Sequence, residues 1–160
     1  MERRLLWEYG GDILRSPNMA IERRIPQHGA VNCFDHSVAV ALLSLWLVRR
    51  LHLRLDRRSL VRGALLHDYF LYDWHDREPS HRLHGFCHAQ RALENAEREF
   101  RLNKVEADII EKHMFPLNLA PPRFRESAVV CCADKVCAVR ETVSGLRRLP
   151  LLRSFRRKTT

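Results

Sequence analysis

Apolar residues recur along this chain at intervals of three and four, which is the spacing of one face of an α-helix. No stretch shows the convincing alternation of apolar and polar residues that a half-buried strand requires. The pattern is clearest from about residue 33 to residue 52, where the repeating residues are Val38, Leu42, Leu45, Trp46 and Leu51. We expect this stripe, Trp46 included, to belong to the core. The sequence therefore predicts an all-α protein, a compact bundle of about six helices.

Capping residues locate the ends of these helices. The side chains that favour helix starts are Ser16, Asn32, Asp56 and Asn103. Pro17 opens a first, short helix, which Pro26 ends. The later predicted helices cover about residues 33–52, 57–68, 86–100, 104–113 and 126–148. We expect loops at "QHGAVNCFD" and at "YDWHDREPSHRLHG", where polar residues, Gly and Pro gather.

The length of 160 residues is most simply one domain, and it is enough to bury a core without a disulfide or a metal. We expect this domain to cover residues 1–148, with a basic tail over residues 149–160. The longest apolar run, residues 38–48, is about half as long as a membrane span. The N-terminus lacks the sustained apolar region of a secretory signal. The sequence therefore predicts a cytoplasmic protein with no membrane span.

The cysteines argue against two common kinds of site. There are 5 of them, and none forms a C-x-x-C pair. An odd number without paired spacing favours neither a disulfide framework nor a thiolate zinc site. We expect reduced thiols, most of them buried as small apolar side chains.

The formal net charge of +9 indicates an affinity for anionic ligands. The basic residues lie in short clusters and at the chain ends, and no aromatic residues alternate with them as in an RNA-binding strand. Nucleic acid is therefore not the favoured partner. A small phosphorylated molecule is the preferred interpretation, and the oligomeric state stays open.

Several histidines lie at the ends of the predicted helices or beside their starts, namely His36, His67, His84, His88 and His113. Two aspartates, Asp68 and Asp134, accompany them on predominantly apolar helices. A single helical histidine is more often a hydrogen-bonded core residue than a ligand. Several of them beside carboxylates on apolar helices are better explained by a cation, because buried carboxylates need partners. Imidazole and carboxylate ligands suit zinc, iron, manganese and similar divalent ions.

The order of these residues resembles a known family. His36, then His67-Asp68, then Asp134 is similar to the H…HD…D signature of the HD-domain metal-dependent phosphohydrolase superfamily. A closer likeness is to small bacterial HD-domain proteins, on the pieces "QHG", "DHS", "LLHD", "LHGFCHA", "KHM" and "ADK". The resemblance covers about residues 25–146. One departure is Ala89, where those relatives tend to have Pro, and Ala suits a helix equally well.

The resemblance implies a set of metal ligands. His36, His67, Asp68 and Asp134 match the positions that bind one metal, and Asp68 would bridge to a second metal in two-metal members. His88 and His113 are the best candidates to complete that second site, with His84 competing with His88. One or two divalent ions are implied, and Fe, Mn, Zn, Co and Ni are not distinguished.

The implied reaction is hydrolysis of a phosphomonoester or phosphodiester of a small anionic substrate, a nucleotide among the candidates, by a metal-activated water. Asp68, His67 and Lys135 would be the catalytic residues. Proximity to the motifs makes His28, His84 and Asp73 candidates for contact with the substrate. Ordinary alternatives remain for three of these residues. Lys135 could point to solvent or pair with a carboxylate, Asp73 could be a loop residue, and His28 could be a turn residue.

Two other functions stay open at the level of sequence. One is a non-catalytic, metal-containing module that binds a nucleotide or nucleic acid through its basic surface. The other is an HD-type oxygenase with two irons. The complete set of ligand residues argues against the first, and only the number of histidines supports the second.

Overall fold

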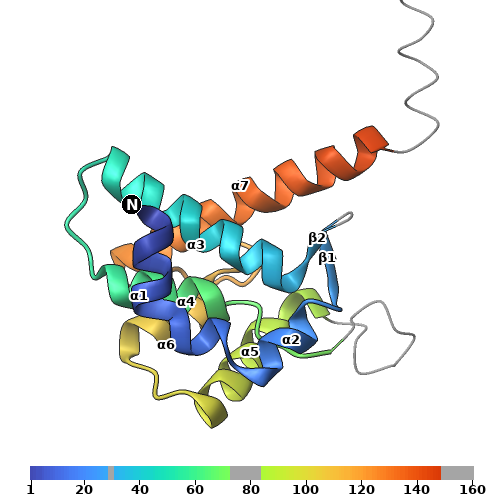
Figure 1. Cartoon of the computed structure of the whole chain (residues 1–160), viewed down its shortest axis with the longest axis horizontal. Coiled ribbons are helices and arrows are strands. Elements are labelled where there is room, and N and C mark those ends of the chain that lie inside the picture. Colours follow the sequence, from blue (N-terminus) through green and yellow to red (C-terminus); the bar gives the residue numbers. More distant parts are fainter. Residues whose placement is uncertain (29–30, 73–83, 149–160) are drawn as a thin grey trace, which may run out of the picture.

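A computed structural model describes residues 1–28, 31–72 and 84–148, with the side chains of residues 28, 84–86 and 145–148 outside that description. Seven helices and one short pair of strands occur in this part of the chain. They are α1 (Glu2–Leu14), α2 (Pro17–Glu22), β1 (Pro26–His28), β2 (Val31–Asn32), α3 (Cys33–Arg50), α4 (Arg57–Leu66), α5 (His84–Glu99), α6 (Lys104–Lys112) and α7 (Arg125–Arg148) (Figure 1). The predicted all-α class is confirmed.

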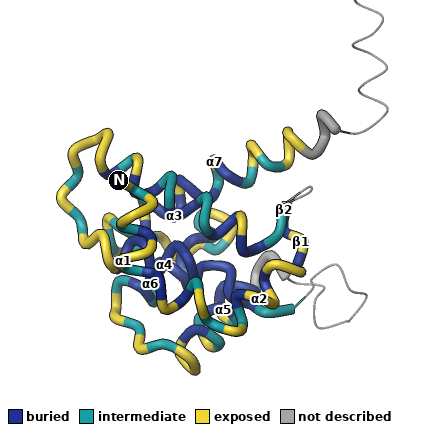
Figure 2. Tube along the Cα trace, viewed as in Figure 1, coloured by how far each residue is buried: buried dark blue, intermediate teal, exposed yellow. Residues whose placement is uncertain are grey.

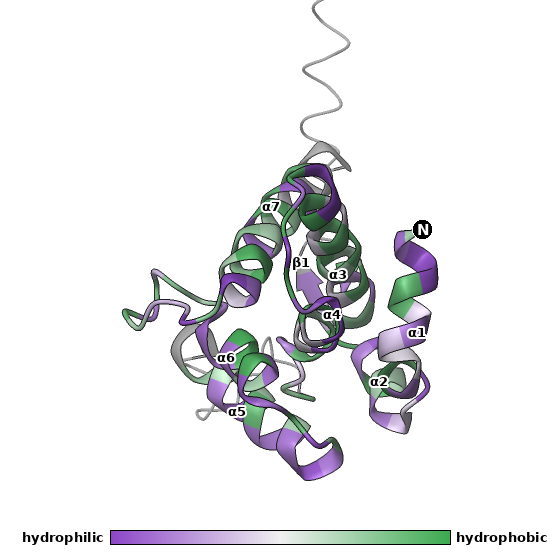
Figure 3. Cartoon of the chain, turned by 90° about the vertical axis from the view of Figure 1, so that its left-hand side faces the viewer, coloured by the Kyte–Doolittle hydropathy of each residue, from purple (hydrophilic) through white to green (hydrophobic). Residues whose placement is uncertain are grey.

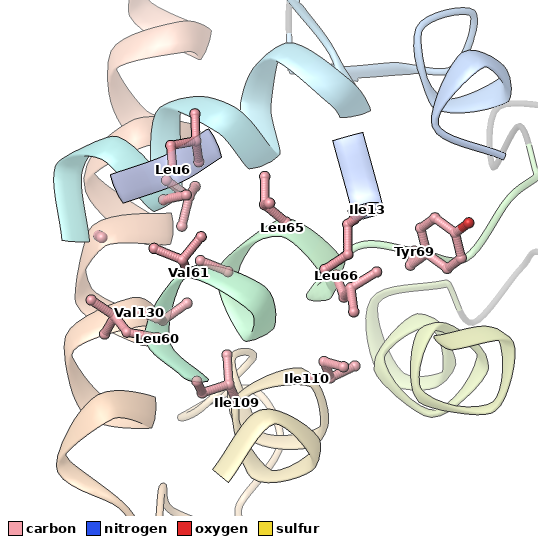
Figure 4. Packing of buried hydrophobic residues seen from close by; sticks show 14 of the residues in the cluster. Leu6, Ile13, Leu60, Val61, Leu65, Leu66, Tyr69, Ile109, Ile110 and Val130 are labelled. Atoms are coloured by element: carbon pink, nitrogen blue, oxygen red, sulfur yellow. The ribbon is translucent and has the colours of Figure 1, made fainter. Parts of the chain in front are cut away.

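Helix α4 is the centre of the bundle. Every residue from Ser59 to Leu66 is buried, as expected of a helix that neighbours surround on all sides. It packs against α1, α3, α6 and α7, and α1 and α2 lie on one side of it with α5 and α6 on the other (Figure 3). The core residues that meet around α4 are Leu6, Ile13, Leu60, Val61, Leu65, Leu66, Ile109, Ile110 and Val130 (Figure 4).

The predicted caps open their helices. Ser16 accepts a hydrogen bond from the backbone of Met19, and Asn32 accepts one from Asp35. Asp56 accepts hydrogen bonds from Arg58 and Ser59 at the start of α4. Asn103 and Glu106 form a complete capping box at α6, which satisfies two backbone donors that a helix start leaves free.

Three features of the fold differ from the prediction. Helix α1 has no counterpart among the predicted helices, because Gly10 and Gly11 occupy two of its four buried positions and leave little apolar periodicity to detect. The segment "QHGAVNCFD" is expected to be a loop, but its start pairs as the strands β1 and β2. These strands are too short for alternation to be visible.

The third difference concerns the stripe on α3. Leu45 is buried as expected, but Trp46 is 44% exposed and Leu51 is 59% exposed. Consecutive residues on a helix point about 100° apart, so Trp46 turns away from the core that holds Leu45. The prediction that Trp46 and Leu51 belong to the core is therefore wrong.

Helix α7 runs beside α3 and continues past the rest of the bundle, so that burial declines toward its C-terminal half (Figures 1 and 2). The half that packs on α3 and α6 carries Asp134. None of the described helices combines the length and the apolar character needed to cross a bilayer.

Candidate metal centre

His67 and Asp68 lie where α4 stops. His67 is the C-cap residue, and its Nδ1–H donates to the carbonyl of Ala64 at 2.8 Å. In the neutral ring that bond places the lone pair on Nε2, which is buried and has no hydrogen-bond partner among the described residues. Asn95 donates to the carbonyls of Tyr69 and Phe70 and so holds the chain that leaves the helix. The end of α4 therefore presents an imidazole nitrogen to the interior.

His113 repeats this arrangement at the end of α6. It is the C-cap residue of that helix, and its Nδ1–H donates to the carbonyl of Ile110 at 2.8 Å. Its Nε2 lies 2.9 Å from Nε2 of His88, which projects from α5. Burial lowers the pKa of His113, although Asp68 acts in the opposite direction. A neutral imidazole is the form that binds a metal.

Asp68 lies between the two sets of imidazoles. Its Oδ2 is 3.3 Å from Nε2 of His67 and 3.8 Å from Nε2 of His36. Its Oδ1 is 3.4 Å from Nε2 of both His88 and His113, and no hydrogen bond in the described part of the chain satisfies that oxygen. Burial alone would raise the pKa of Asp68, but the imidazoles of His67, His113 and His88 hold it well below the usual range. Asp68 is therefore a buried carboxylate that faces both sets.

His36 and Asp134 lie with His67 on the other side of Asp68 from His88 and His113. Nε2 of His36 lies 3.1 Å from Oδ1 of Asp134, and its Nδ1 lies 2.8 Å from Oε2 of Glu141. Burial alone would lower the pKa of His36, but these two carboxylates and Asp68 raise it to about 10. The pKa of Asp134 is lowered by its imidazole neighbours against the effect of burial.

The six residues form two groups of three, each with its donor atoms within 4.8 Å of one another. The first group is His36, His67 and Asp134, and the second is Asp68, His88 and His113. All six are buried. A cation fits this donor set, because it would satisfy the atoms that hydrogen bonds leave unsatisfied, Nε2 of His67 and Oδ1 of Asp68. Nitrogen and oxygen donors without thiolate suit iron, manganese, zinc and their neighbours.

The structure thus brings together all six predicted ligands, from α3, α4, α5, α6 and α7. The residues predicted to contact the substrate lie at or beyond the edges of the described part of the chain. His28 lies in β1 and His84 begins α5, but their side chains are outside the described residues, as is the whole of Asp73. Their predicted roles stay predictions.

Lys135 does not project among the imidazoles. Its Nζ donates to the carbonyl of His113 at 2.8 Å and to the carbonyl of Cys131 at 3.4 Å. It also lies 3.9 Å from Oδ2 of Asp134. The ammonium group therefore ties α7 to the end of α6, and its catalytic role stays a prediction.

Three polar residues at the site are absent from the predicted set. Glu141 lies seven residues after Asp134 on α7, and that interval returns a helix to the same face, so the spacing could have identified it. Gln27 belongs to the "QHG" motif, and its Nε2–H donates to Oδ2 of Asp68. Neither a motif nor a helical spacing in the sequence indicates that Glu22 lies at the site.

Glu22 is fully buried at the end of α2, and neither of its carboxyl oxygens has a hydrogen-bond partner among the described residues. Burial raises the pKa of Glu22 well above its ordinary value, and the negative charge of Asp68 raises it further. The pKa of Glu22 is thus raised, whereas the pKa values of the neighbouring Asp68 and Asp134 are lowered.

Comparison with known proteins gives one match. The family model described as the HD domain matches residues 33–139, a range that contains all six residues of the two groups. Searches of the curated proteins and of the solved structures gave no match.

Proposed function

Since this chain belongs to the HD domain family, we propose that it is a metal-dependent phosphohydrolase that cleaves a phosphomonoester or phosphodiester of a small anionic substrate. Family membership suggests activity of this type, and the groups of histidine and aspartate could hold a metal. The observation that carries the proposal is the buried carboxylate of Asp68 between two sets of imidazoles.

In this proposal the six residues hold one or two divalent ions. His36, His67 and Asp134 would hold the first ion, and His88 and His113 would hold the second. Asp68 would offer one oxygen to each group. A divalent metal bound there lowers the pKa of its water toward about 7 and polarises a phosphoryl oxygen.

The surrounding residues orient the proposed metal ligands. Carbonyls of α4 and α6 accept the Nδ1–H of His67 and His113, which keeps each Nε2 unprotonated for a metal. Glu141 orients His36 in the same way. Lys135 holds the backbone of His113 against α7. We propose that His28, His84 and Asp73 lie near the substrate, as their place in the motifs suggests.

The substrate and location belong to the same proposal. A chain with a net charge of +9 attracts small phosphorylated molecules. All five cysteines are free thiols, which favours the reducing cytoplasm over an oxidising compartment.

A single experiment tests the reaction and the metal together. Protein purified without oxygen is analysed for metals, then loaded in turn with manganese, iron, cobalt, nickel or zinc and assayed on a broad panel of phosphoesters. We expect hydrolysis with at least one metal, and we expect Asp68→Ala to reduce both bound metal and activity to background. Glu97→Gln is the matched control, because Glu97 is exposed on α5.

Loaded wild-type protein that hydrolyses nothing in the panel would refute the reaction. If it contained iron and consumed oxygen instead, the oxygenase alternative would replace it.

A further inference from the structure

The strand β1 contains a bulge at Gln27. Pro26 pairs with Asn32 and His28 pairs with Val31, so β1 has one more residue than β2 between these pairs. A bulge re-aims a side chain that regular pairing would place elsewhere. Gln27 is 8% exposed, and β1 packs against α3 and α7, which carry His36 and Asp134. The hairpin therefore directs the amide side chain of Gln27 toward the candidate metal centre.

This amide holds one particular oxygen of Asp68. Nε2–H of Gln27 donates to Oδ2, the oxygen that faces His67. The other oxygen, Oδ1, is left to face His88 and His113. The terminal torsion of an aspartate side chain is soft, so rotation of the carboxylate would change which histidines each oxygen faces. A donor on one oxygen resists that rotation.

A second hydrogen bond fixes the amide itself. Sγ–H of Cys33 donates to Oε1 of Gln27 at 3.3 Å, and Cys33 is fully buried. An amide can present either its donor or its acceptor to a neighbour. With Oε1 engaged by the thiol, the amino group faces the carboxylate. Cys33, Gln27 and Asp68 thus form a buried chain of hydrogen bonds with a defined direction.

We propose that Gln27 is a positioning residue, which orients the Asp68 carboxylate so that one oxygen serves each group of histidines. This inference rests on the proposed metal centre. It assigns Gln27 a larger effect on the group of Asp68, His88 and His113 than on the group of His36, His67 and Asp134, because Asp68 is one of the three members of the former and an additional neighbour of the latter.

The test substitutes Gln27→Met in the full chain, because methionine is of similar length and cannot donate. Manganese(II) alone is titrated into metal-free protein. The affinity of the ion held by Asp68, His88 and His113, which is the ion lost in His88→Ala, should fall about 10- to 100-fold, the range found when a partner that orients a ligand is removed. The affinity of the ion held by His36, His67 and Asp134 should change little. Gln90→Met is the matched control, because Gln90 is exposed on α5.

Two further variants separate positioning from simple support of the hairpin. Cys33→Ala removes the donor that orients the amide and should weaken binding of the same ion. Cys33→Ser should restore it, because a hydroxyl also donates to Oε1. Cobalt(II) provides a second readout, since its visible absorption should change in Gln27→Met and Cys33→Ala but not in Cys33→Ser.

The results distinguish the two proposals. Wild-type protein that binds neither manganese nor cobalt would refute the metal centre and this inference with it. If wild type binds metal and Gln27→Met matches it in affinity and cobalt spectrum, only the role of Gln27 is wrong. A lower melting temperature with unchanged metal binding would likewise refute the positioning role, as would Cys33→Ala and Cys33→Ser variants that bind metal equally well.

Discussion

Nε2 of His88 and Nε2 of His113 lie 2.9 Å apart, buried between α5 and α6. His113 donates its Nδ1–H to Ile110, so the neutral ring has its lone pair on Nε2. Both nitrogens also lie 3.4 Å from Oδ1 of Asp68. Two imidazole nitrogens and a carboxylate oxygen that converge in this way suit a divalent cation.

The first prediction concerns the number of metal ions. His88→Ala removes one donor from the group that includes His113 and Asp68, and leaves the group of His36, His67 and Asp134 complete. Elemental analysis of the loaded variant should find one ion fewer than in wild type. His52→Asn should leave the count unchanged, because His52 is exposed and asparagine tolerates its positive φ. Equal counts in His88→Ala and wild type would exclude His88 as a ligand.

The second prediction is a pH dependence set by Glu141. The pKa of His36 is raised from 6.5 to about 10 in the folded, metal-free protein, so the protonated ring stabilises the fold. This contribution is complete below the unfolded pKa and is lost as the pH rises through the folded pKa. Glu141→Gln removes one of the two bonded carboxylates. Its destabilisation should be greatest near pH 6 and decline toward pH 10, as thermal unfolding of metal-free protein would measure.

Glu8→Gln serves as the control for that series, because Glu8 is exposed on α1. It should unfold like wild type at each pH. A deficit in Glu141→Gln that stays constant from pH 6 to pH 10 would contradict the assigned cause.

The third prediction is a substitution that stabilises the protein instead of destabilising it. Glu22 has a raised pKa, so the unfolded chain releases its proton near the ordinary value of 4.5 while the folded protein keeps it. Folding is therefore opposed increasingly as the pH rises above that value. Glu22→Gln removes this effect with little change in shape. In metal-free protein, the stability advantage of the variant over wild type should grow from pH 5 to pH 8, as urea unfolding would measure. An advantage that shrinks over this range would refute a neutral Glu22.

The fourth prediction concerns a buried ion pair between α4 and α6. Arg62 is buried, and its Nε lies 3.2 Å from Oε1 of Glu106, which is fully buried. Its Nη1 donates to Asp12 at 2.7 Å. Arg62→Met leaves Glu106 with only the more exposed Arg58, whose Nη1 lies 3.4 Å from the same oxygen, and should lower the free energy of unfolding by about 3 kcal/mol or less. Denaturant unfolding measures the loss.

Two variants check the reason for that loss. Asp12→Asn should cost about 1 kcal/mol or less, because the Asp12 side chain is 57% exposed. Arg62→Met combined with Glu106→Gln should recover much of the stability, because residue 106 then carries no buried charge. A double variant as unstable as Arg62→Met alone would show that lost packing, rather than the charge of Glu106, is responsible.

Local signals in the sequence were sufficient for most of the helices. Capping and periodicity act over a few residues, so Asn32, Asp56 and Asn103 open helices where their side chains predict. The same signals failed for α1, whose buried side includes Gly10 and Gly11. They also failed for Trp46, because periodicity finds an apolar face without showing how much of it neighbours cover.

The order of histidines and aspartates along the chain was enough to indicate the candidate ligands, because it resembles the H…HD…D signature of the HD-domain superfamily. The orientation of those ligands depends on packing. Gln27 and Asp68 are 41 residues apart, and His36 and Glu141 are 105 apart. Contacts over such separations form only when helices pack around α4, because no local rule relates the two partners. Residue identity and order, through the resemblance to the HD-domain superfamily, thus determined the set of candidate metal-binding side chains, and the packed bundle alone decided which oxygen of Asp68 faces which histidine.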